Sequence, residues 1–379
     1  MNNRNPLRRH FGKINRKNKP GEKKSVMGSE TKTVRQGEEL NEANLSEFLR
    51  EQLNLTSAEI EIRQFPAGSS NLTYLVKIGA EEFVLRRPPF GNQVKTAHDM
   101  SREFRVLEKL SKIYQPAPRP LLFCQDESII GSEFYLMERK RGVILRGSAP
   151  DAVQSSPELQ KAVCESFIDN LAALHNLDYK QAELGDFGKP EGYVERQTTG
   201  WIDRYFRAKT DECPEIEFTT EWLRANVPAT SNRAALVHND YKFDNVMLAP
   251  DDLTEIVGVL DWEMATVGEP LMDLGTTLGY WMDKRAPQFM LSQPFNPRVL
   301  MENFSRRALA ERYAEKTGAD ISNLLFYYVF GTFKIAAIVQ QIYFRYRRGF
   351  TKDERFANFN HFVSALSKIA VIAIETEKV

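Results

Sequence analysis

Cysteine is scarce in this 379-residue chain, and the three present, Cys124, Cys164 and Cys213, lie far apart. Such an odd, scattered set indicates neither a disulfide framework nor a zinc site, and it favours a reducing, cytoplasmic location. Long apolar runs are also missing, because Lys334 interrupts the stretch Leu324–Val339, which falls short of the ~18 apolar residues of a membrane span. The N-terminus has no apolar segment typical of a secretory signal. We therefore expect no membrane insertion.

Net charge is absent as well, since 51 Lys and Arg balance 51 Asp and Glu. The chain as a whole therefore has no strong electrostatic preference for nucleic acid or an acidic surface. The balance hides an asymmetry, because residues 1–24 hold nine basic residues and one acidic residue. We expect residues 1–36 to form a disordered basic tail. A solvated tail is favoured over an arm that binds nucleic acid or an anionic membrane, and the arm stays open as an alternative.

What the chain does have is a dense cluster of polar residues between two apolar runs. Residues 236–263 read LVHNDYKFDNVMLAPDDLTEIVGVLDWE. The two apolar runs around the turn at residues 249–252 predict a β-hairpin. That hairpin would bring Asp240, Asn245 and Asp261 to one end of a small sheet. Three oxygen-bearing side chains in one place suit a hard divalent cation and a hydroxyl nucleophile. Taken singly, each could instead be a turn or strand-end residue.

The spacing His238-x-Asp240-x4-Asn245, followed sixteen positions later by Asp261-Trp262-Glu263, resembles the catalytic loop of the protein-kinase-like superfamily. The polar residue at 239 and the lack of glycine after Asp261 are similar to the aminoglycoside phosphotransferase and choline kinase branch. The resemblance implies an α+β, two-lobed fold. It has a small N-lobe with an antiparallel sheet and a nucleotide site at 37–139, and a large helical C-lobe at 140–379.

The resemblance also implies roles for the motif residues, with ATP and Mg²⁺ as cofactors. Asp240 would accept or orient the proton of the acceptor hydroxyl, and Lys242 would steady the γ-phosphate. Asn245 and Asp261 would hold Mg²⁺. Glu263 would reach a second metal or orient the loop.

The N-lobe shows strands around a turn of small residues, Gly68, Ser69, Ser70 and Asn71. A strand–turn–strand layout before the catalytic motif suits a loop that covers nucleotide phosphates with its free N–H groups. With a single glycine, an ordinary hairpin turn is an equally good interpretation.

A cation is expected on the third strand, which reads FVLRRPP at residues 83–89. By the resemblance it would hold the α- and β-phosphates, with arginine in the place of the usual lysine. Alternation along the strand favours Arg86 over Arg87, since Arg86 shares a face with Val84. Glu103, on the helix predicted from residue 99 to 110, would pair with Arg86. The resemblance also makes Met137, Glu138 and Arg139 the hinge that offers backbone groups to adenine.

Two other segments invite comparison with kinase motifs. The string Asp186-Phe187-Gly188 is a decoy for the kinase Asp-Phe-Gly motif, because it precedes the motif at His238–Asn245 in the chain. Residues 195–209 mix aromatic and basic side chains, which could bind an anionic acceptor or simply form a packing helix.

His175 is interpreted as a packed or capping residue. Asp273 matches an aspartate that anchors the catalytic loop in relatives.

The remaining periodicity predicts helices at 38–53, 157–177, 271–281, 296–317, 321–345 and 353–374. No activation segment follows Glu263, which favours a small-molecule hydroxyl acceptor over a protein. Phrases such as VLRRPP and HNDYKFDNVML resemble the phosphotransferase domains associated with acyl-CoA dehydrogenases, and imply a hydroxyacyl-CoA or hydroxy acid acceptor. An aminoglycoside ranks second and choline or another amino alcohol third. A non-catalytic nucleotide-binding module is the alternative of another class.

Overall fold

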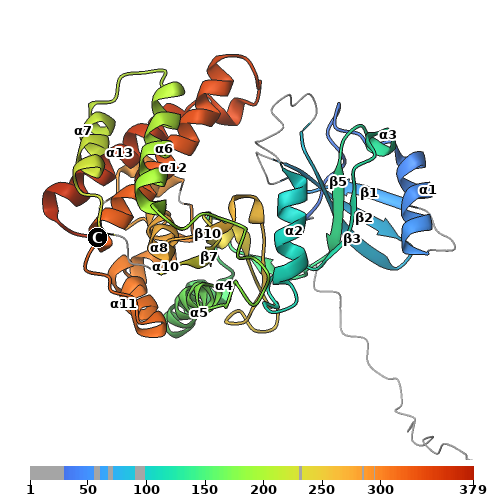
Figure 1. The fold of residues 1–379 in the computed structure, drawn as a ribbon, viewed down its shortest axis with the longest axis horizontal. Helices are drawn as coiled ribbons and strands as arrows, with labels where there is room; N and C mark the ends of the chain where they lie inside the picture. The colour runs from blue at the N-terminus through green and yellow to red at the C-terminus, as the bar shows by residue number, and fades with distance from the viewer. Residues whose placement is uncertain are drawn as a thin grey trace, which may run out of the picture.

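A five-stranded antiparallel sheet forms the N-terminal part of the computed structural model, which describes residues 30–54, 60–66, 71–89, 99–229, 233–283, 286–293 and 295–379. The strand order is β1-β2-β3-β5-β4. The strands are β1 Ile60–Gln64, β2 Leu72–Ile78, β3 Glu81–Arg87, β4 Pro120–Cys124 and β5 Phe134–Glu138. Within the described residues, three helices accompany the sheet, α1 Glu42–Leu53, α2 Met100–Leu110 and α3 Glu127–Ile130. Figure 1 shows α2 between the sheet and the larger lobe, with α1 and α3 on the far side.

Both faces of this sheet are covered, and strand alternation sorts the side chains between them. Leu85 belongs to the apolar cluster under α1 and α3. Its neighbour Val84 belongs to the cluster that continues through α2 into the larger lobe. Helix α2 begins at the N-cap Asp99, whose side chain accepts a hydrogen bond from the Arg102 amide. Its buried face includes Glu103, so a carboxylate stands within an apolar stripe and needs a cationic partner.

The described part of the larger lobe holds two small sheets. One is a three-stranded sheet of β6 Val143–Ile144, β8 Val246–Leu248 and β9 Ile256–Val259, and the other pairs β7 Ala235–Val237 with β10 Thr266–Gly268. The predicted hairpin is confirmed as β8 and β9, which pair in antiparallel register. Short 3-10 turns flank this hairpin, η1 Phe243–Asn245 directly before β8 and η2 Trp262–Met264 after β9.

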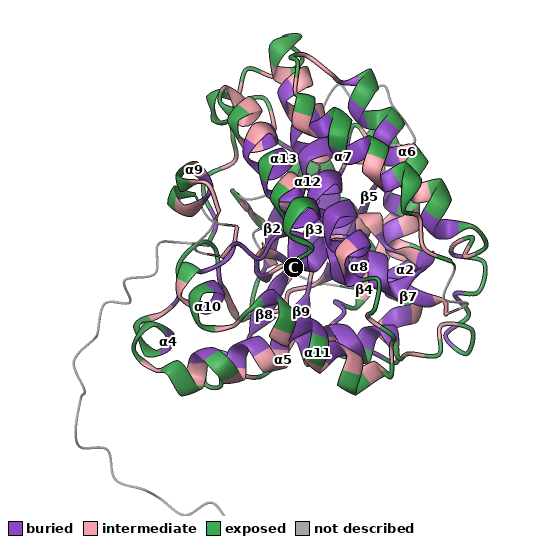
Figure 2. Ribbon diagram, turned by 90° about the vertical axis from the view of Figure 1, so that its left-hand side faces the viewer, coloured by how far each residue is buried: buried purple, intermediate pink, exposed green. Residues whose placement is uncertain are grey.

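Helices make up the rest of this lobe. They are α4 Asp151–Ser155, α5 Pro157–His175, α6 Tyr193–Arg207, α7 Pro214–Ala225, α8 Pro270–Gly279, α9 Gln288–Ser292, α10 Arg298–Asn303, α11 Arg306–Thr317, α12 Leu324–Arg347 and α13 Phe359–Thr376, with the 3-10 turn η3 Glu354–Phe356 before α13. Buried residues concentrate along α8 and α12 (Figure 2). The two helices approach closely because Gly275 and Gly331 face each other. A Cβ on Gly275 would lie 2.0 Å from the Tyr327 carbonyl oxygen.

The structure corrects several predicted boundaries. The single helix predicted at 296–317 is two, because the chain turns at Phe304 and Ser305 caps α11. The helix predicted at 353–374 is η3 followed by α13. Helix α7 was not predicted. The first helix begins at Glu42, after the N-cap Asn41.

The absence of membrane insertion stays a prediction, and α12, which contains Leu324–Val339, is longer and more apolar than that prediction assumed. Among the described residues, Leu324–Arg347 and Glu354–Thr376 both pass a test of length and mean hydropathy. In α12, 78% of the most apolar 18-residue stretch is buried inside the protein. In Glu354–Thr376 the buried share of such a stretch is 44%. A buried core helix satisfies the same test, because burial in protein and burial in lipid select the same side chains.

Candidate active site

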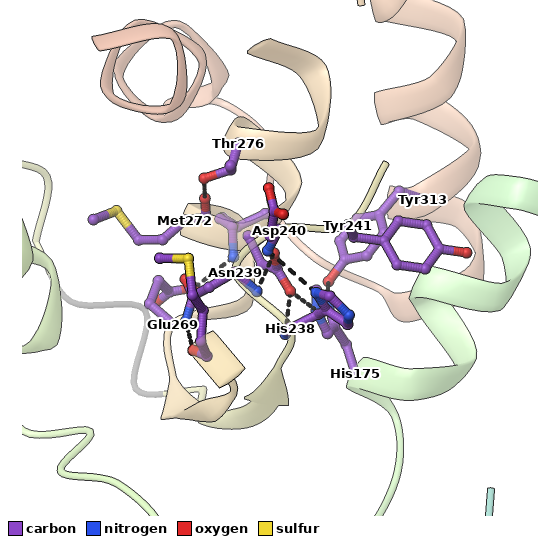
Figure 3. Close-up of polar contacts among 12 residues, drawn as sticks. His175, His238, Asn239, Asp240, Tyr241, Glu269, Met272, Thr276 and Tyr313 are labelled. Atoms are coloured by element: carbon purple, nitrogen blue, oxygen red, sulfur yellow. Dashed lines mark hydrogen bonds and ion pairs between the residues drawn. The ribbon is translucent and has the colours of Figure 1, made fainter. Parts of the chain in front are cut away.

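The loop from His238 to Asn245, called the HND loop below, is anchored from beneath by the first turn of α8. The Asp273 carboxylate accepts hydrogen bonds from the backbone amides of His238 at 2.6 Å and Asn239 at 2.8 Å. His175 adds a contact from its Nε2 at 3.1 Å, while its Nδ1 lies 2.7 Å from the Tyr313 hydroxyl. Figure 3 shows His175 and Tyr313 converging on the loop from their own helices. His175 is therefore a packed residue, as predicted.

Burial alone would raise the pKa of Asp273, but the hydrogen bond and charge of His175 outweigh burial, and the pKa of Asp273 is lowered. The carboxylate therefore stays ionised as the acceptor for the loop amides.

Asn239 needs this anchoring because its backbone is left-handed, with φ of +67°. Such a conformation is costly for a residue with a side chain and persists only where its surroundings determine it. The Lys334 ammonium, from α12, donates to the Asn239 carbonyl at 2.7 Å. The Asn239 side-chain amide donates to the Tyr193 hydroxyl at 3.2 Å and to the Met264 carbonyl at 3.1 Å. The residue before Asp240 is thus held at its amide, its carbonyl and its side chain.

The Asp240 carboxylate is contacted on both oxygens. Its Oδ2 accepts from Lys242 Nζ at 2.7 Å and from Asn245 Nδ2 at 3.0 Å. Its Oδ1 accepts from the Tyr280 hydroxyl at 2.5 Å. Burial opposes the charge of Lys242, but Asp240 outweighs burial and raises the pKa of Lys242. The predicted pair Asp240 and Lys242 therefore lies together as an ion pair.

Asp261 comes to the same place through the hairpin. The Leu260 amide donates to the Asn245 carbonyl at 2.8 Å, and His238 Nε2 lies 2.9 Å from the Leu260 carbonyl. Asp261 itself is left-handed, with φ of +67°, at the turn into η2. Hydrogen bonds to the backbone of Leu260 thus hold the end of the hairpin beside the HND loop.

Arg86 links the N-lobe to this end of the hairpin. Its guanidinium donates to Glu103 Oε1 at 2.5 Å and to Asp261 Oδ1 at 2.9 Å, and it lies 3.8 Å from Glu263. Burial opposes the charge of Arg86, but these carboxylates, Glu103 first, raise its pKa. Burial likewise acts to raise the pKa of Asp261, whereas Arg86 lowers it below the ordinary value. The predicted pairing of Arg86 with Glu103 is present.

The neighbouring Arg87 points to the other face of the sheet. Its guanidinium donates to the carbonyls of Ile130, in α3, at 2.8 Å and Pro88 at 3.0 Å. Strand alternation therefore separates the two arginines, and Arg86 is the one beside Asp261.

Asn71 also crosses between the lobes, because its side-chain amide donates to Glu263 Oε2 at 2.7 Å. Gly68, Ser69 and Ser70, predicted to cover the phosphates, lie outside the described residues, and their role stays a prediction. Asn71 and Glu263 are within reach of the Arg86 network, so the structure brings one predicted nucleotide residue to a predicted metal residue.

The predicted hinge occupies the end of β5 and the segment after it. Met137 is buried, and the Glu138 amide donates to the Arg119 carbonyl at 2.9 Å. The Arg139 side chain pairs with Glu82. These contacts leave the Glu138 amide and the Arg139 guanidinium engaged within the protein, and the role of the hinge in binding adenine stays a prediction.

The decoy string lies apart from this constellation. The Asp186 side chain is 77% exposed, and its contact with Arg105 is 3.9 Å long. The Arg102 guanidinium lies over the Phe187 ring, with its carbon 4.1 Å from the centroid of that ring.

Two residues of the site were not predicted from the sequence, Tyr280 and Lys334. Tyr280 follows Asp273 by seven positions, which is two helical turns and places both on one side of α8. Lys334 carries the charge that interrupts the most apolar stretch of the chain. A cation within the apolar sequence of a core helix indicates that a polar partner is buried beside it. The charge that argues against a membrane span is therefore also the sequence signal for the contact with the Asn239 carbonyl.

This combination of a two-lobed fold with an Asp–Lys–Asn loop beside a strand-end aspartate defines a kinase-like phosphotransferase. A model of the phosphotransferase enzyme family matches residues 61–295, and the chain belongs to that family. Human acyl-CoA dehydrogenase family member 11 is 33% identical over 335 residues, covering 86% of this chain and 42% of that protein. The chain therefore spans about two fifths of the length of this curated relative.

Solved structures confirm the predicted fold class. A Ralstonia eutropha JMP134 protein, provisionally named as an aminoglycoside phosphotransferase, is 27% identical with a TM-score of 0.73, over 88% of this chain and 97% of its own. Choline kinase from Cryptosporidium parvum Iowa II is 15% identical with a TM-score of 0.57, over 87% of this chain and 96% of its own. The second likeness concerns the fold alone.

Proposed function

We propose that this protein transfers the γ-phosphoryl group of ATP to a hydroxyl of a small molecule, with a hydroxyacyl-CoA or hydroxy acid as the expected acceptor. The observation that carries the proposal is the Asp240 carboxylate, held by Lys242 and Asn245 in the HND loop that the hairpin joins to Asp261. Asp240 accepts the hydroxyl proton as the oxygen attacks phosphorus. Lys242 and Arg86 hold phosphate oxygens. Catalysis then depends mainly on positioning and on preorganised charge.

The donor set fits Mg²⁺, although no cluster of three or more His, Cys, Asp or Glu ligands occurs among the described residues. The predicted set of Asn245, Asp261 and Glu263 includes an amide. Asn245 donates from its nitrogen to Asp240, so its Oδ1 is the side-chain atom that can serve as a metal ligand. Oxygen ligands of this kind suit Mg²⁺, which when bound would neutralise phosphate charge.

Three features support a small, anionic acceptor. Strand β10 and then α8 follow Glu263 at once, so no activation segment offers a surface for a protein substrate. The Arg204 guanidinium lies 4.8 Å from the Trp201 ring, which is also 5.6 Å from the Lys334 ammonium that holds the HND loop. The positive charge of Arg204 favours a carboxylate or phosphate over a cationic aminoglycoside or choline. The curated relatives also bear acyl-CoA dehydrogenase names.

The test is an ATP-consumption screen, with hydroxyacyl-CoAs, free hydroxy acids, aminoglycosides and amino alcohols compared at equal concentration with Mg²⁺. We expect turnover with the hydroxyacyl or hydroxy acid group and loss of about 10³-fold in Asp240→Asn. Turnover with aminoglycosides alone would reassign the acceptor. ATP binding without turnover of any of these compounds would favour the non-catalytic module, and parental turnover in Asp240→Asn would refute the role of Asp240.

A further inference from the structure

Tyr280 touches the catalytic carboxylate from the far end of α8. It is the C-cap residue of that helix and is 5% exposed. Its carbonyl accepts from Asn296 Nδ2 at 3.1 Å, and its ring packs edge-on against Phe295 at 5.2 Å. Lys242 Nζ lies 4.9 Å from the ring centroid. The side chain is therefore fixed on several sides, with its hydroxyl at the Asp240 carboxylate.

The two oxygens of Asp240 have different partners. Oδ2 receives Lys242 and Asn245, which belong to the HND loop itself. Oδ1 receives a single donor from the part of the chain that the structure describes, the Tyr280 hydroxyl. An acceptor hydroxyl that gives its proton to Asp240 has to approach within hydrogen-bond distance of one of these oxygens. At Oδ1 the exchange of one donor, the Tyr280 hydroxyl, is enough to admit the acceptor, whereas at Oδ2 a donor of the HND loop itself would have to leave.

We propose that the Tyr280 hydroxyl occupies the acceptor-hydroxyl position on Asp240 Oδ1 when no acceptor is bound, and so keeps water from that position. The inference rests on the proposed function, because it assigns Asp240 the role of proton acceptor. Burial and the neighbouring Asp240 charge both raise the pKa of Tyr280, so its hydroxyl remains a protonated donor at neutral pH.

The chemistry that Tyr280 controls is the choice of nucleophile. When the acceptor hydroxyl replaces the Tyr280 hydroxyl, its oxygen forms a bond to the γ-phosphorus and its proton passes to Asp240. The bond from that phosphorus to the β,γ-bridging oxygen breaks, and the nucleoside diphosphate leaves. If water took the same position, the same bonds would form and break, and the product would be inorganic phosphate. Tyr280 thus determines how far ATP hydrolysis competes with transfer.

The experiment measures phosphate release from ATP with Mg²⁺ and no acceptor in the full chain. We expect Tyr280→Phe to raise acceptor-independent hydrolysis about tenfold, because water gains the vacated position on Oδ1. Tyr343→Phe is the matched control. Its hydroxyl, on the buried face of α12, accepts a hydrogen bond from Arg347 outside the site, and this variant should hydrolyse ATP at the parental rate. Parental hydrolysis in Tyr280→Phe would overturn the inference.

A double variant separates this inference from the proposed function. In Tyr280→Phe with Asp240→Asn the extra hydrolysis should disappear, because the water loses its proton acceptor. Persistence of the extra hydrolysis would overturn the gating role. Transfer that survives Asp240→Asn alone would instead refute the proposed function. If Tyr280→Phe does not melt cooperatively, Tyr280→Met keeps an apolar filler and makes the same comparison with the same two outcomes.

Discussion

The HND loop has two sides that differ in what holds them. Beneath it, Asp273 and Lys334, 0% and 1% exposed, bind the backbone of His238 and Asn239. On its open side, Asp240 of the loop and Asp261 at the adjoining end of the hairpin are held by side-chain ion pairs, with side chains 14% and 34% exposed. The difference teaches that the loop's backbone is fixed by buried groups, while its carboxylates rest in contacts that a ligand can exchange. Loss of the Asp273 acceptor beneath the loop should therefore reduce stability and turnover together, whereas variants on the open side should change turnover or affinity alone.

The largest effect is expected from Asp273→Ala. The change leaves two buried amides without an acceptor and releases the left-handed Asn239, so we expect the free energy of unfolding to fall by about 3–5 kcal/mol. Denaturant unfolding measures the loss, and turnover with ATP should fall with it. Asp186→Ala, at an exposed aspartate, is the matched control and should change neither quantity. A loss below about 1 kcal/mol would contradict the anchoring role.

Sequence patterns predicted the residues on the open side of the HND loop better than those beneath it. Asp240, Asn245 and Asp261 stand at fixed spacing around a hairpin with its own turn residues, so local pattern alone brings them together. The resemblance implied a cation on the third strand and a glutamate on the next helix, and two short-range regularities, strand alternation and helical spacing, then selected Arg86 and Glu103. Asp273 was placed by resemblance. The contacts of Tyr280 and Lys334 depend on how α8 and α12 cross at Gly275 and Gly331, which no local periodicity contains.

Helix boundaries in the C-lobe show the same limit. Apolar periodicity continues through residues 296–317, but the break before α11 is set by the cap at Ser305 and by Trp281, whose ring N–H donates to the Phe304 carbonyl at 2.7 Å. Apolar periodicity shows which face of a helix is buried. It does not reveal a turn between two consecutive helices that bury the same face.

An intermediate effect is expected from Lys334→Met, which separates the stability of the underside from its function. Burial lowers the pKa of Lys334 to about 8, although Asp273 and Asp240 oppose the shift, and Lys242 and Arg204 add to it. Below pH 8 the folded protein bears the full cost of the buried charge. Between pH 8 and the unfolded value near 10.4 the unfolded chain binds more protons, so stability rises with pH by up to roughly 3 kcal/mol.

Lys334→Met should remove that rise and leave stability at pH 7 equal to or above that of the parent. Turnover should fall about tenfold, because the Asn239 carbonyl loses its charged donor. Denaturant unfolding at pH 7 and pH 9.5 measures the first effect and steady-state kinetics the second. Lys368→Met, at an exposed position on α13, is the control. A parental pH dependence in Lys334→Met would show that the buried ammonium does not carry the effect.

The smallest effect is expected from Arg86→Lys on the open side. A single ammonium cannot span Glu103 and Asp261 as the guanidinium fork does, so one of the two contacts is lost. We expect the KM for ATP to rise about fivefold to tenfold, with the free energy of unfolding within about 1 kcal/mol of the parent. Arg87→Lys is the matched control, because Arg87 lies on the opposite sheet face and donates to the Ile130 carbonyl. Its KM for ATP should be parental. Equal changes in KM for the two variants would mean that the increase comes from general loosening of β3. Arg86 would then no longer support the distinction between the two sides of the loop.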